Sequence, residues 1–484
     1  AIASRRVEFF PEAFARRNAE LTRLAGTVLV DGLDDREQGA PTDAYRRAHS
    51  MRAAPLGGLG ACRIGQDGRV YLAAKSEHYQ LSLGHAFPGY GLIDLARELG
   101  IPNATHNNTR GHLTRIAERE LVAAANGIED EATLNALLAS TDPRALNRVI
   151  NLETGSLAAE AALKMMLTRF FDADGVDDRE PGAVPVFLVI GDLAGGTTAN
   201  YHGTTVLAQT LRGLWPAFTA RAAEAGLFRV VPVGIDDPAG FAATFERYNT
   251  GEYRVAGFCH EIVLMNYGGL LLDPDFLRQA YRLCHDHGVL VFCDEIQSGA
   301  WYEDLFLFRR FGLDPDLGAV GKGFPGGMYP ASKILATAGA DRLSQFGALV
   351  TNGQEELASL SYLITMEFAR ANGDQLRRIG LAYHVGLDRL VARYPDLLAA
   401  VSGDRHMAGI QFHEAAAAAA FCHALETDHG IDTSTQAYKP SAPPTALTKL
   451  PLIADEVTLD VLLDRMDTVL AGLRTAAPTP ASAR

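Results

Sequence analysis

The sequence is poor in cysteine, with five in 484 residues: Cys62, Cys259, Cys284, Cys293 and Cys422. Their number is odd and no CxxC or Cys/His metal spacing is present, so the pattern indicates neither a disulfide framework nor a zinc site and fits reduced thiols. Basic residues are also few, because 44 Lys and Arg stand against 58 Asp and Glu and give a net charge of −14. This balance argues against a nucleic acid or an anionic membrane surface as partner.

Long apolar runs are absent as well. None reaches membrane-spanning length, and the first residues, AIASRRVEFFPEAFARRNAEL, lack the apolar core of a signal peptide. We therefore expect a soluble, cytoplasmic protein. Hydrophobic residues at 48% and charged residues at 21% are ordinary values, which exclude the disordered and fibrous classes. A chain of 484 residues is too long for one compact core and predicts two or three domains.

The most informative stretch combines an acid with a lysine. Residues 289–293, VLVFC, follow a glycine and predict a strand buried on both faces, with Asp294 at its carboxyl end. Ligands bind at that end of the strands in open α/β sheets. Further on, Lys322 stands in GKGFPGG, where its neighbours carry almost no side chain. A bulky group can therefore approach this amine closely.

An acid at a strand end and a lysine among glycines are the two groups that a pyridoxal phosphate enzyme requires. The amine forms a Schiff base with the cofactor aldehyde, and the carboxylate keeps the pyridine nitrogen protonated. A surface lysine in an ordinary turn is the alternative, and it would be preferred for an isolated GKG. The segments DEIQSG and DPDLGAVGKGFPGGMYP resemble signatures of class III pyridoxal phosphate-dependent aminotransferases, the fold type I group of the ornithine and 4-aminobutyrate enzymes.

This resemblance implies a role for each matching residue. Lys322 would hold pyridoxal 5'-phosphate and shuttle a proton, Asp294 would pair with the pyridinium, and Gln297 would contact the ring hydroxyl. Glu261 opens EIVLMNYGGLLLDPDFL, which aligns without gaps on a family segment and keeps the glutamate. In Tyr201-His202-Gly203, which matches the family's YHG, the tyrosine would stack on the pyridine ring.

The cofactor phosphate has its own expected site. Residues 151–164 begin with a helix-entry signal and resemble the family segment in which backbone amides and a hydroxyl bind phosphate. The equivalents here are Thr154, Gly155 and Ser156, although Leu157 and Ala159 depart from the family pattern. Exposed amides and the helix dipole favour an anion at such a helix start, although any N-cap can contain the same residue types.

The resemblance also implies a dimer. Thr351, in Thr351-Asn352-Gly353, corresponds to a family threonine that reaches the cofactor phosphate of the neighbouring subunit; a simple loop or helix cap is the alternative. Residues 1 to about 50 are charged and amphipathic and predict an arm that lies on another surface, with a partner subunit as the natural candidate. We therefore expect a homodimer with shared active sites.

The substrate region departs most from the family. Leu447 stands where many relatives carry an arginine that clamps the substrate carboxylate. Either the substrate lacks a carboxylate there, or another cation replaces the arginine, and Arg110 and Lys449 are the candidates. Arg110 is favoured because residues 73–112 are rebuilt relative to the family. His106 and His112 flank Arg110, but they lack a third ligand at useful spacing, so a solvated loop is favoured over a metal site.

Strands and helices alternate from about residue 115 to 335 and predict a mostly parallel α/β sheet. The expected fold is that of a fold type I enzyme, with a smaller α+β domain built from both termini. We assign 1–115 to the arm and part of the small domain, 116–365 to the large cofactor-binding domain and 366–484 to the C-terminal small domain. Aminotransfer to or from an amine or amino acid is the expected reaction. Racemisation, decarboxylation and oxidative decarboxylation on the same fold remain alternatives, and a non-catalytic homologue is the remote one.

Overall fold

The structure is a computed structural model that describes residues 4–34, 36–37, 39–173, 175, 178–193, 197–435, 439 and 441–476. Its centre is a sheet of eight strands. Seven of them follow the order β4-β13-β12-β11-β8-β5-β6, and the eighth, β7, pairs with β5 outside this order. Pairs among β12, β11, β8, β5 and β7 are parallel, whereas β13 runs against both of its neighbours and β6 runs against β5. The bounds are β4 (Leu146–Leu152), β5 (Val184–Asp192), β6 (Thr197–Thr198), β7 (Arg229–Val233), β8 (Tyr253–His260), β11 (Leu290–Asp294), β12 (Leu317–Val320) and β13 (Ser332–Thr337).

Both faces of this sheet are covered, because its central strands are apolar at successive positions. In β5, Val186, Leu188 and Ile190 pack into one core cluster, while Phe187 and Val189 pack into another on the opposite face. This division follows from the alternation of side chains along a strand. The surrounding helices are α4 (Gly91–Glu98), α5 (His112–Asn126), α6 (Glu131–Ala139), α7 (Gly155–Leu167), α8 (Val206–Leu211), α9 (Pro216–Glu224), α10 (Pro238–Tyr248), α11 (Pro274–Asp286), α12 (Leu307–Arg310), α13 (Gln345–Ala348) and α14 (Glu356–Ala371).

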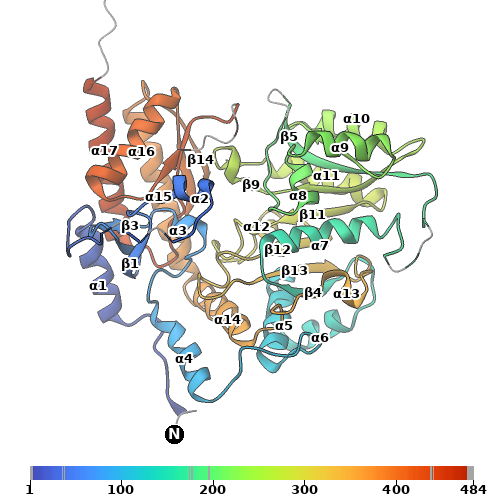
Figure 1. Cartoon of the computed structure of the whole chain (residues 1–484), viewed down its shortest axis with the longest axis horizontal. Coiled ribbons are helices and arrows are strands. Elements are labelled where there is room, and N and C mark those ends of the chain that lie inside the picture. The colour runs from blue at the N-terminus through green and yellow to red at the C-terminus, as the bar shows by residue number, and fades with distance from the viewer. Residues whose placement is uncertain are drawn as a thin grey trace, which may run out of the picture.

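A second body is built from the two ends of the chain, which lie side by side in Figure 1. Its four-stranded antiparallel sheet has the order β14-β15-β17-β16, and a three-stranded sheet, β1-β2-β3, joins it through a bridge between Leu72 and Ile431. Apolar residues of both termini share one core cluster. The bounds are α1 (Glu12–Arg23), α2 (Asp43–Ala48), β1 (Pro55–Leu59), β2 (Cys62–Gly65), β3 (Val70–Leu72), α3 (Ser76–Tyr79), β14 (Leu398–Asp404), β15 (Met407–Phe412), β16 (Ser434–Thr435) and β17 (Thr445–Leu447), with α15 (Gly373–Arg393), α16 (Ala415–His429) and α17 (Glu456–Ala476). A two-stranded ribbon pairs β9 (Val263–Leu264) with β10 (Leu270–Leu271).

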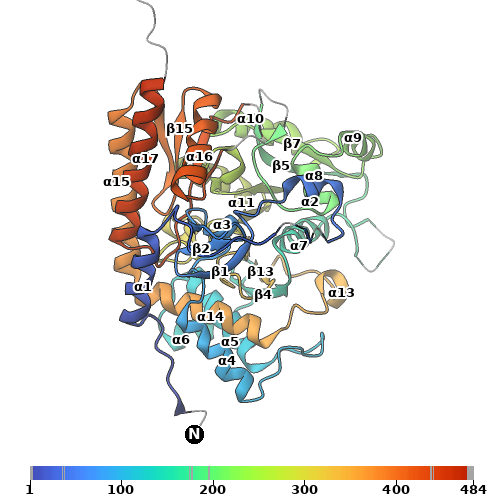
Figure 2. The same ribbon diagram turned by 60° about the vertical axis from the view of Figure 1, so that its left-hand side comes forward.

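The predicted fold class is confirmed: a mostly parallel sheet carries helices on both faces beside a smaller α+β body. The expected strand at 289–293 is β11. The amphipathic arm contains α1, which packs on α17 of the same chain (Figure 2). Within the described residues, no helix combines the length and apolar character that crossing a membrane requires.

Candidate active site

The carboxyl end of β11 places Asp294 in the interior, where its side chain is almost completely buried. Its Oδ2 lies 3.0 Å from His202 Nδ1, and its Oδ1 accepts a hydrogen bond of 3.0 Å from the Ile296 backbone N–H. The His202 ring packs against Phe292 of the same strand, with 5.6 Å between ring centroids. Asp294 is therefore held in one orientation by two donors from different segments.

Lys322 follows β12, the parallel neighbour of β11, so both groups come from the same edge of the sheet. Its backbone has a φ of 39°, in the left-handed region that only a well-supported loop can hold for a side chain of this size. The Lys322 Nζ lies 5.6 Å from the centre of the Tyr79 ring. The partly buried amine therefore faces an aromatic wall supplied by the N-terminal part of the chain.

The glycines beside Lys322 have a packing reason. A β-carbon at Gly323 would lie 1.9 Å from the Trp301 ring, and one at Gly326, whose φ is +58°, would lie 1.6 Å from the Tyr90 hydroxyl. The chain can therefore pass between these two aromatic side chains only as glycine.

Three ionisable groups share this interior. Burial lowers the pKa of Lys322, while the negative charges of Glu261 and Asp294 oppose that shift. Burial and the Asp294 charge raise the pKa of Glu261 well above its ordinary value. Glu261 Oε2 has no hydrogen-bond partner among the described residues, and neither does Oε1 of the buried Gln297. Buried polar atoms normally have partners, so both point to a polar group that completes the site.

Thr154, Gly155 and Ser156 form the start of α7, as predicted. Thr154 is the N-cap, and its side chain accepts a hydrogen bond from the Leu157 N–H at 3.4 Å. Ser156 Oγ accepts a hydrogen bond of 3.0 Å from the Thr204 N–H, which brings the loop after β6 against the helix start. The first N–H groups of a helix have no acceptor within it, so this end suits an anion.

Tyr201 and His202 belong to the same loop. The Arg212 guanidinium lies over the Tyr201 ring, 4.6 Å from its centre. The positive charge of Arg212 also favours the ionised form of Glu261. Arg212 has no hydrogen bond or ion pair with any side chain that the structure describes. The loop therefore brings an aromatic ring and an imidazole toward Glu261 and Asp294, and the end of α8 adds the cation.

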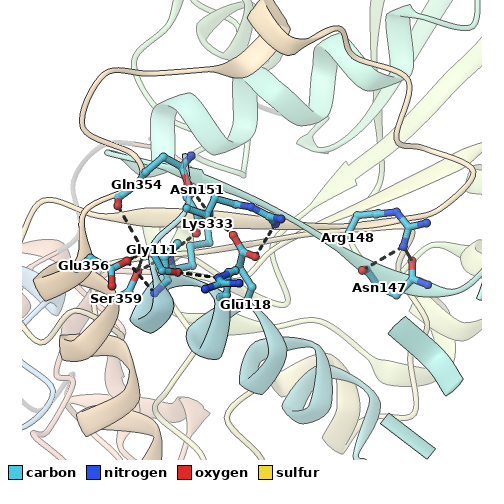
Figure 3. Close-up of polar contacts among 12 residues, drawn as sticks. Gly111, Glu118, Asn147, Arg148, Asn151, Lys333, Gln354, Glu356 and Ser359 are labelled. Atoms are coloured by element: carbon cyan, nitrogen blue, oxygen red, sulfur yellow. Dashed lines mark hydrogen bonds and ion pairs between the residues drawn. The ribbon is translucent and has the colours of Figure 1, made fainter. Parts of the chain in front are cut away.

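Thr351 is exposed in a turn between α13 and α14. The Asn352 N–H donates to Glu153 Oε1 at 3.3 Å, so this turn lies beside the start of α7. The segment after this turn contributes to a buried polar network, defined by Glu118, Asn151, Lys333, Gln354, Glu356 and Ser359 (Figure 3). Lys333 donates to Asn151 and Ser359, and Glu356 accepts the Leu113 N–H at 2.9 Å.

The two predicted substrate cations lie in different surroundings. Arg110 is more than half exposed and pairs with Glu118 at 2.8 Å. Lys449 is fully buried, and its amine donates to the backbone carbonyls of Gln297 and Tyr79. The structure thus gathers Lys322, Asp294, Glu261, Gln297 and the Tyr201 loop into one interior, while Arg110 lies in the neighbouring polar network.

Sequence reasoning missed four residues of this interior: Tyr79, Trp301, Arg212 and Lys439. Burial lowers the pKa of Lys439 to about 8, and the Glu261 and Asp192 charges act on it in the opposite direction. The only signal for Tyr79 was the unusual segment AAKSEHYQL, and Trp301 is one of two tryptophans in the chain. Arg212 and Lys439 had no local signal, because only the folded chain brings them to Glu261.

Comparison with known proteins decides the family. The profile of the family described as Aminotransferase class-III matches residues 57–468. The chain belongs to the class-III aminotransferase family. Its curated relatives include the ornithine aminotransferase of Emericella nidulans, which is 25% identical over 67% of this chain. The matched part spans 66% of that relative, just under two thirds of the relative's length. The ornithine aminotransferase of an Exiguobacterium species is 28% identical over 67% of this chain and 74% of that relative.

Solved structures show that the class-III fold extends over nearly the whole chain. An ornithine aminotransferase from Toxoplasma gondii superposes with a TM-score of 0.71 at 19% identity, covering 90% of this chain and 95% of that one. A transaminase from the marine bacterium Virgibacillus gives a TM-score of 0.71 at 15% identity, covering 90% and 96%. The family is pyridoxal phosphate-dependent, and Lys322 and Asp294 stand in the segments that resemble its signatures.

Proposed function

We propose that this class-III aminotransferase transfers amino groups between an amino acid and a 2-oxo acid, with pyridoxal 5'-phosphate bound at Lys322. The observation that carries the proposal is the position of three groups: Lys322 follows β12, the fixed Asp294 carboxylate ends the neighbouring strand β11, and Gly155 at the start of α7 packs against Ile296, as Gly321 beside Lys322 also does. The partnerless oxygens of Glu261 and Gln297 fit a polar ring between them. When bound, the cofactor supplies an aldehyde for the amine and a ring that accepts electrons from the substrate carbon.

The side chains of this chain then have separate tasks. Lys322 holds the cofactor and, once released, carries the proton at the substrate carbon through its Nζ; its lowered pKa keeps more of the amine in the neutral form that this requires. Asp294, oriented by His202, would pair with the protonated pyridine nitrogen. Thr154, Gly155 and Ser156 would hold the phosphate, and Tyr201, His202 and Gln297 would contact the ring and its hydroxyl.

The substrate enters beside the N-terminal segment. A cavity of about 490 Å³ lies there, lined by Lys75, Glu77, His78, Gln80, His85, Gly327 and Asp432, among others. Gly327 belongs to the Lys322 loop, and burial together with the Lys322 charge lowers the pKa of His78. We propose that the part of the amino acid remote from the reacting amine occupies this cavity.

Three cations are candidates for the substrate carboxylate, because Leu447 cannot bind one. Arg110 and Lys449 were expected from the sequence, and Arg212 joins them because it lies over Tyr201 beside Glu261. Arg212 is only partly buried, and no carboxylate of the described residues lies at ion-pair distance from it. Of the three candidates, it alone combines these two properties.

We further propose a homodimer in which Thr351 of one protomer reaches the cofactor phosphate held by its partner. Large apolar side chains remain exposed around residues 28–33 and at Phe346, which is 78% exposed and lies five positions before Thr351. Exposed apolar groups of this kind mark association surfaces, and a second copy of the chain is the occupant that a shared site requires.

The deciding experiment incubates the purified enzyme with panels of amino acids and 2-oxo acids and identifies products by mass spectrometry. We expect paired conversion of an amino donor and a 2-oxo acceptor, and release of carbon dioxide without amino transfer would contradict the proposal. Lys322→Ala should abolish turnover. A peptide map of borohydride-reduced enzyme should locate the cofactor on Lys322; its attachment to another lysine would refute the assignment.

A further inference from the structure

The turn from Ser76 to Tyr79 has an unusual backbone. All four residues have positive φ, at 47°, 47°, 58° and 77°, and none is a glycine. Side chains rarely adopt this left-handed region, and such conformations persist only where the surroundings over-determine them. Contacts from elsewhere in the chain must therefore hold the turn.

One set of contacts lies on the outer side of the turn. Glu77 Oε2 pairs with Arg63 at 2.8 Å, and Glu77 Oε1 lies 2.9 Å from His85 Nε2. Arg63, which is buried, also pairs with Asp432 at 3.0 Å. These contacts fix the side chain of Glu77 but do not touch Tyr79.

Lys449 contacts the inner side of the turn at several points. Its carbonyl accepts a hydrogen bond of 2.6 Å from Ser76 Oγ, and its backbone N–H donates to the Ala74 carbonyl at 2.7 Å. Its Nζ donates to the Tyr79 carbonyl at 3.3 Å. Lys449 therefore binds the turn at its beginning and at its end.

The same amine reaches the other wall of the site. It donates to the Gln297 carbonyl and lies 3.6 Å from the centre of the Trp301 ring. No carboxylate of the described residues is at ion-pair distance from it. Burial and the Lys322 charge lower its pKa. A fully buried amine without a counter-ion is costly, which favours a specific role at this position.

Tyr79 connects this contact to the reactive centre. Two amines lie near its ring, whose centre is 5.6 Å from Lys322 Nζ and 5.5 Å from Lys449 Nζ. We propose that Lys449 is a positioning residue that ties the strained turn Ser76–Tyr79 to Gln297 and so fixes Tyr79 against Lys322. This inference rests on the proposed role of Lys322 as the amine that carries the cofactor.

The test replaces the amine and keeps the aliphatic stem, as in Lys449→Met. Hydrogen exchange of the full-length enzyme, read by peptide mass spectrometry, should accelerate at least tenfold for peptides covering 74–82. The value of kcat should fall at least tenfold, while KM for a carboxylate-bearing amino acid changes less than threefold. A structural role alone would not produce this split.

Lys333→Met is the matched control, because Lys333 is also buried and also lies near an aromatic ring. Its amine is 5.1 Å from the centre of the Tyr362 ring. It lies in the network of Figure 3, so its loss should accelerate exchange at 111–118 and 351–359 but not at 74–82. If Lys449→Met does not fold, Ser76→Ala removes the hydroxyl contact from the turn side and should accelerate exchange in the same 74–82 peptides.

Two outcomes would overturn the proposal. Unchanged exchange at 74–82 in both variants would show that Lys449 does not hold the turn. A rise in KM for carboxylate-bearing substrates only, with kcat unchanged, would make Lys449 a substrate ligand instead. Failure of the proposed function is separate, because it would appear in the wild-type peptide map as a cofactor bound to a lysine other than Lys322.

Discussion

At the scale of single residues, the site depends on charges that the fold keeps out of water. Lys322, Asp294 and Glu261 lie in one interior, where burial and the Asp294 charge raise the pKa of Glu261, and burial lowers the pKa of Lys322 against the charges of Glu261 and Asp294. Electrostatic interactions are stronger there than in solvent because the surrounding protein is less polarisable. Neutralising any one of the three should therefore disturb the chemistry much more than the fold.

Asp294→Asn tests this directly. The amide keeps an oxygen acceptor for the Ile296 N–H but removes the negative charge near the proposed pyridine nitrogen. Losing one member of a buried charge pair costs about 2–5 kcal/mol, so we expect turnover to fall on the order of a hundredfold or more. Steady-state kinetics measures the loss, and circular dichroism should show an unchanged fold. Near-normal turnover would mean that the acid is misassigned.

Arg212→Ala tests the carboxylate site. The planar guanidinium can bind a carboxylate through two hydrogen bonds, so its loss should raise KM for an acidic substrate at least tenfold. Arg110→Ala is the matched comparison, because the Arg110 charge is already paired with Glu118. We expect Arg110→Ala to raise KM less than Arg212→Ala does. The reverse order of the two effects would assign the carboxylate to Arg110.

At the scale of secondary-structure elements, the end of β11 contributes a second acid besides Asp294. Glu295 accepts the Phe308 N–H of α12 at 2.7 Å and a hydrogen bond from Ser298. Burial raises its pKa from 4.5 to about 7. Because this pKa is raised in the folded state, the stability that Glu295 contributes is present below about pH 4.5. It is lost as the pH rises through 7, where the folded enzyme must hold the charged form.

Glu295→Gln should remove this dependence. The free energy of unfolding of the variant, relative to that of the wild type, should rise progressively between pH 5 and 8, by up to about 3 kcal/mol. Thermal unfolding at four pH values in this range measures the trend. Glu303→Gln is the control, because the ion pairs of Glu303 with Arg405 and Arg377 lower its pKa to about 2. The Glu303→Gln variant should be destabilised by the same amount at every pH in this range. If the stability of both variants changed with pH in the same way, the pH dependence could not be assigned to Glu295.

At the scale of the whole molecule, the proposed shared site requires two chains. Thr351 is exposed in a single chain. We expect sedimentation velocity to give a dimer. Mixed dimers of Lys322→Ala with Thr351→Glu should regain roughly one quarter of the wild-type activity, because half of the dimers are mixed and each has one intact site. An active monomer, or no recovery after subunit exchange, would exclude a shared site.

The sequence by itself determined the features that depend on neighbouring residues. The apolar run before Asp294 predicted β11, the polar entry at Thr154 predicted the start of α7, and the glycines around Lys322 predicted a loop open to close approach. Periodicity and turn chemistry are local properties, so they can be read from a single sequence. The α/β class follows from the order of such elements along the chain.

Only the tertiary structure decided which distant residues complete the site. Tyr79 and Trp301 come from separate parts of the chain, and Arg212 reaches Glu261 only in the folded state. It also decided that α1 lies on α17 of its own chain. These contacts form because buried aromatic rings and polar groups must find partners across the core, and no local pattern records which partner each one finds.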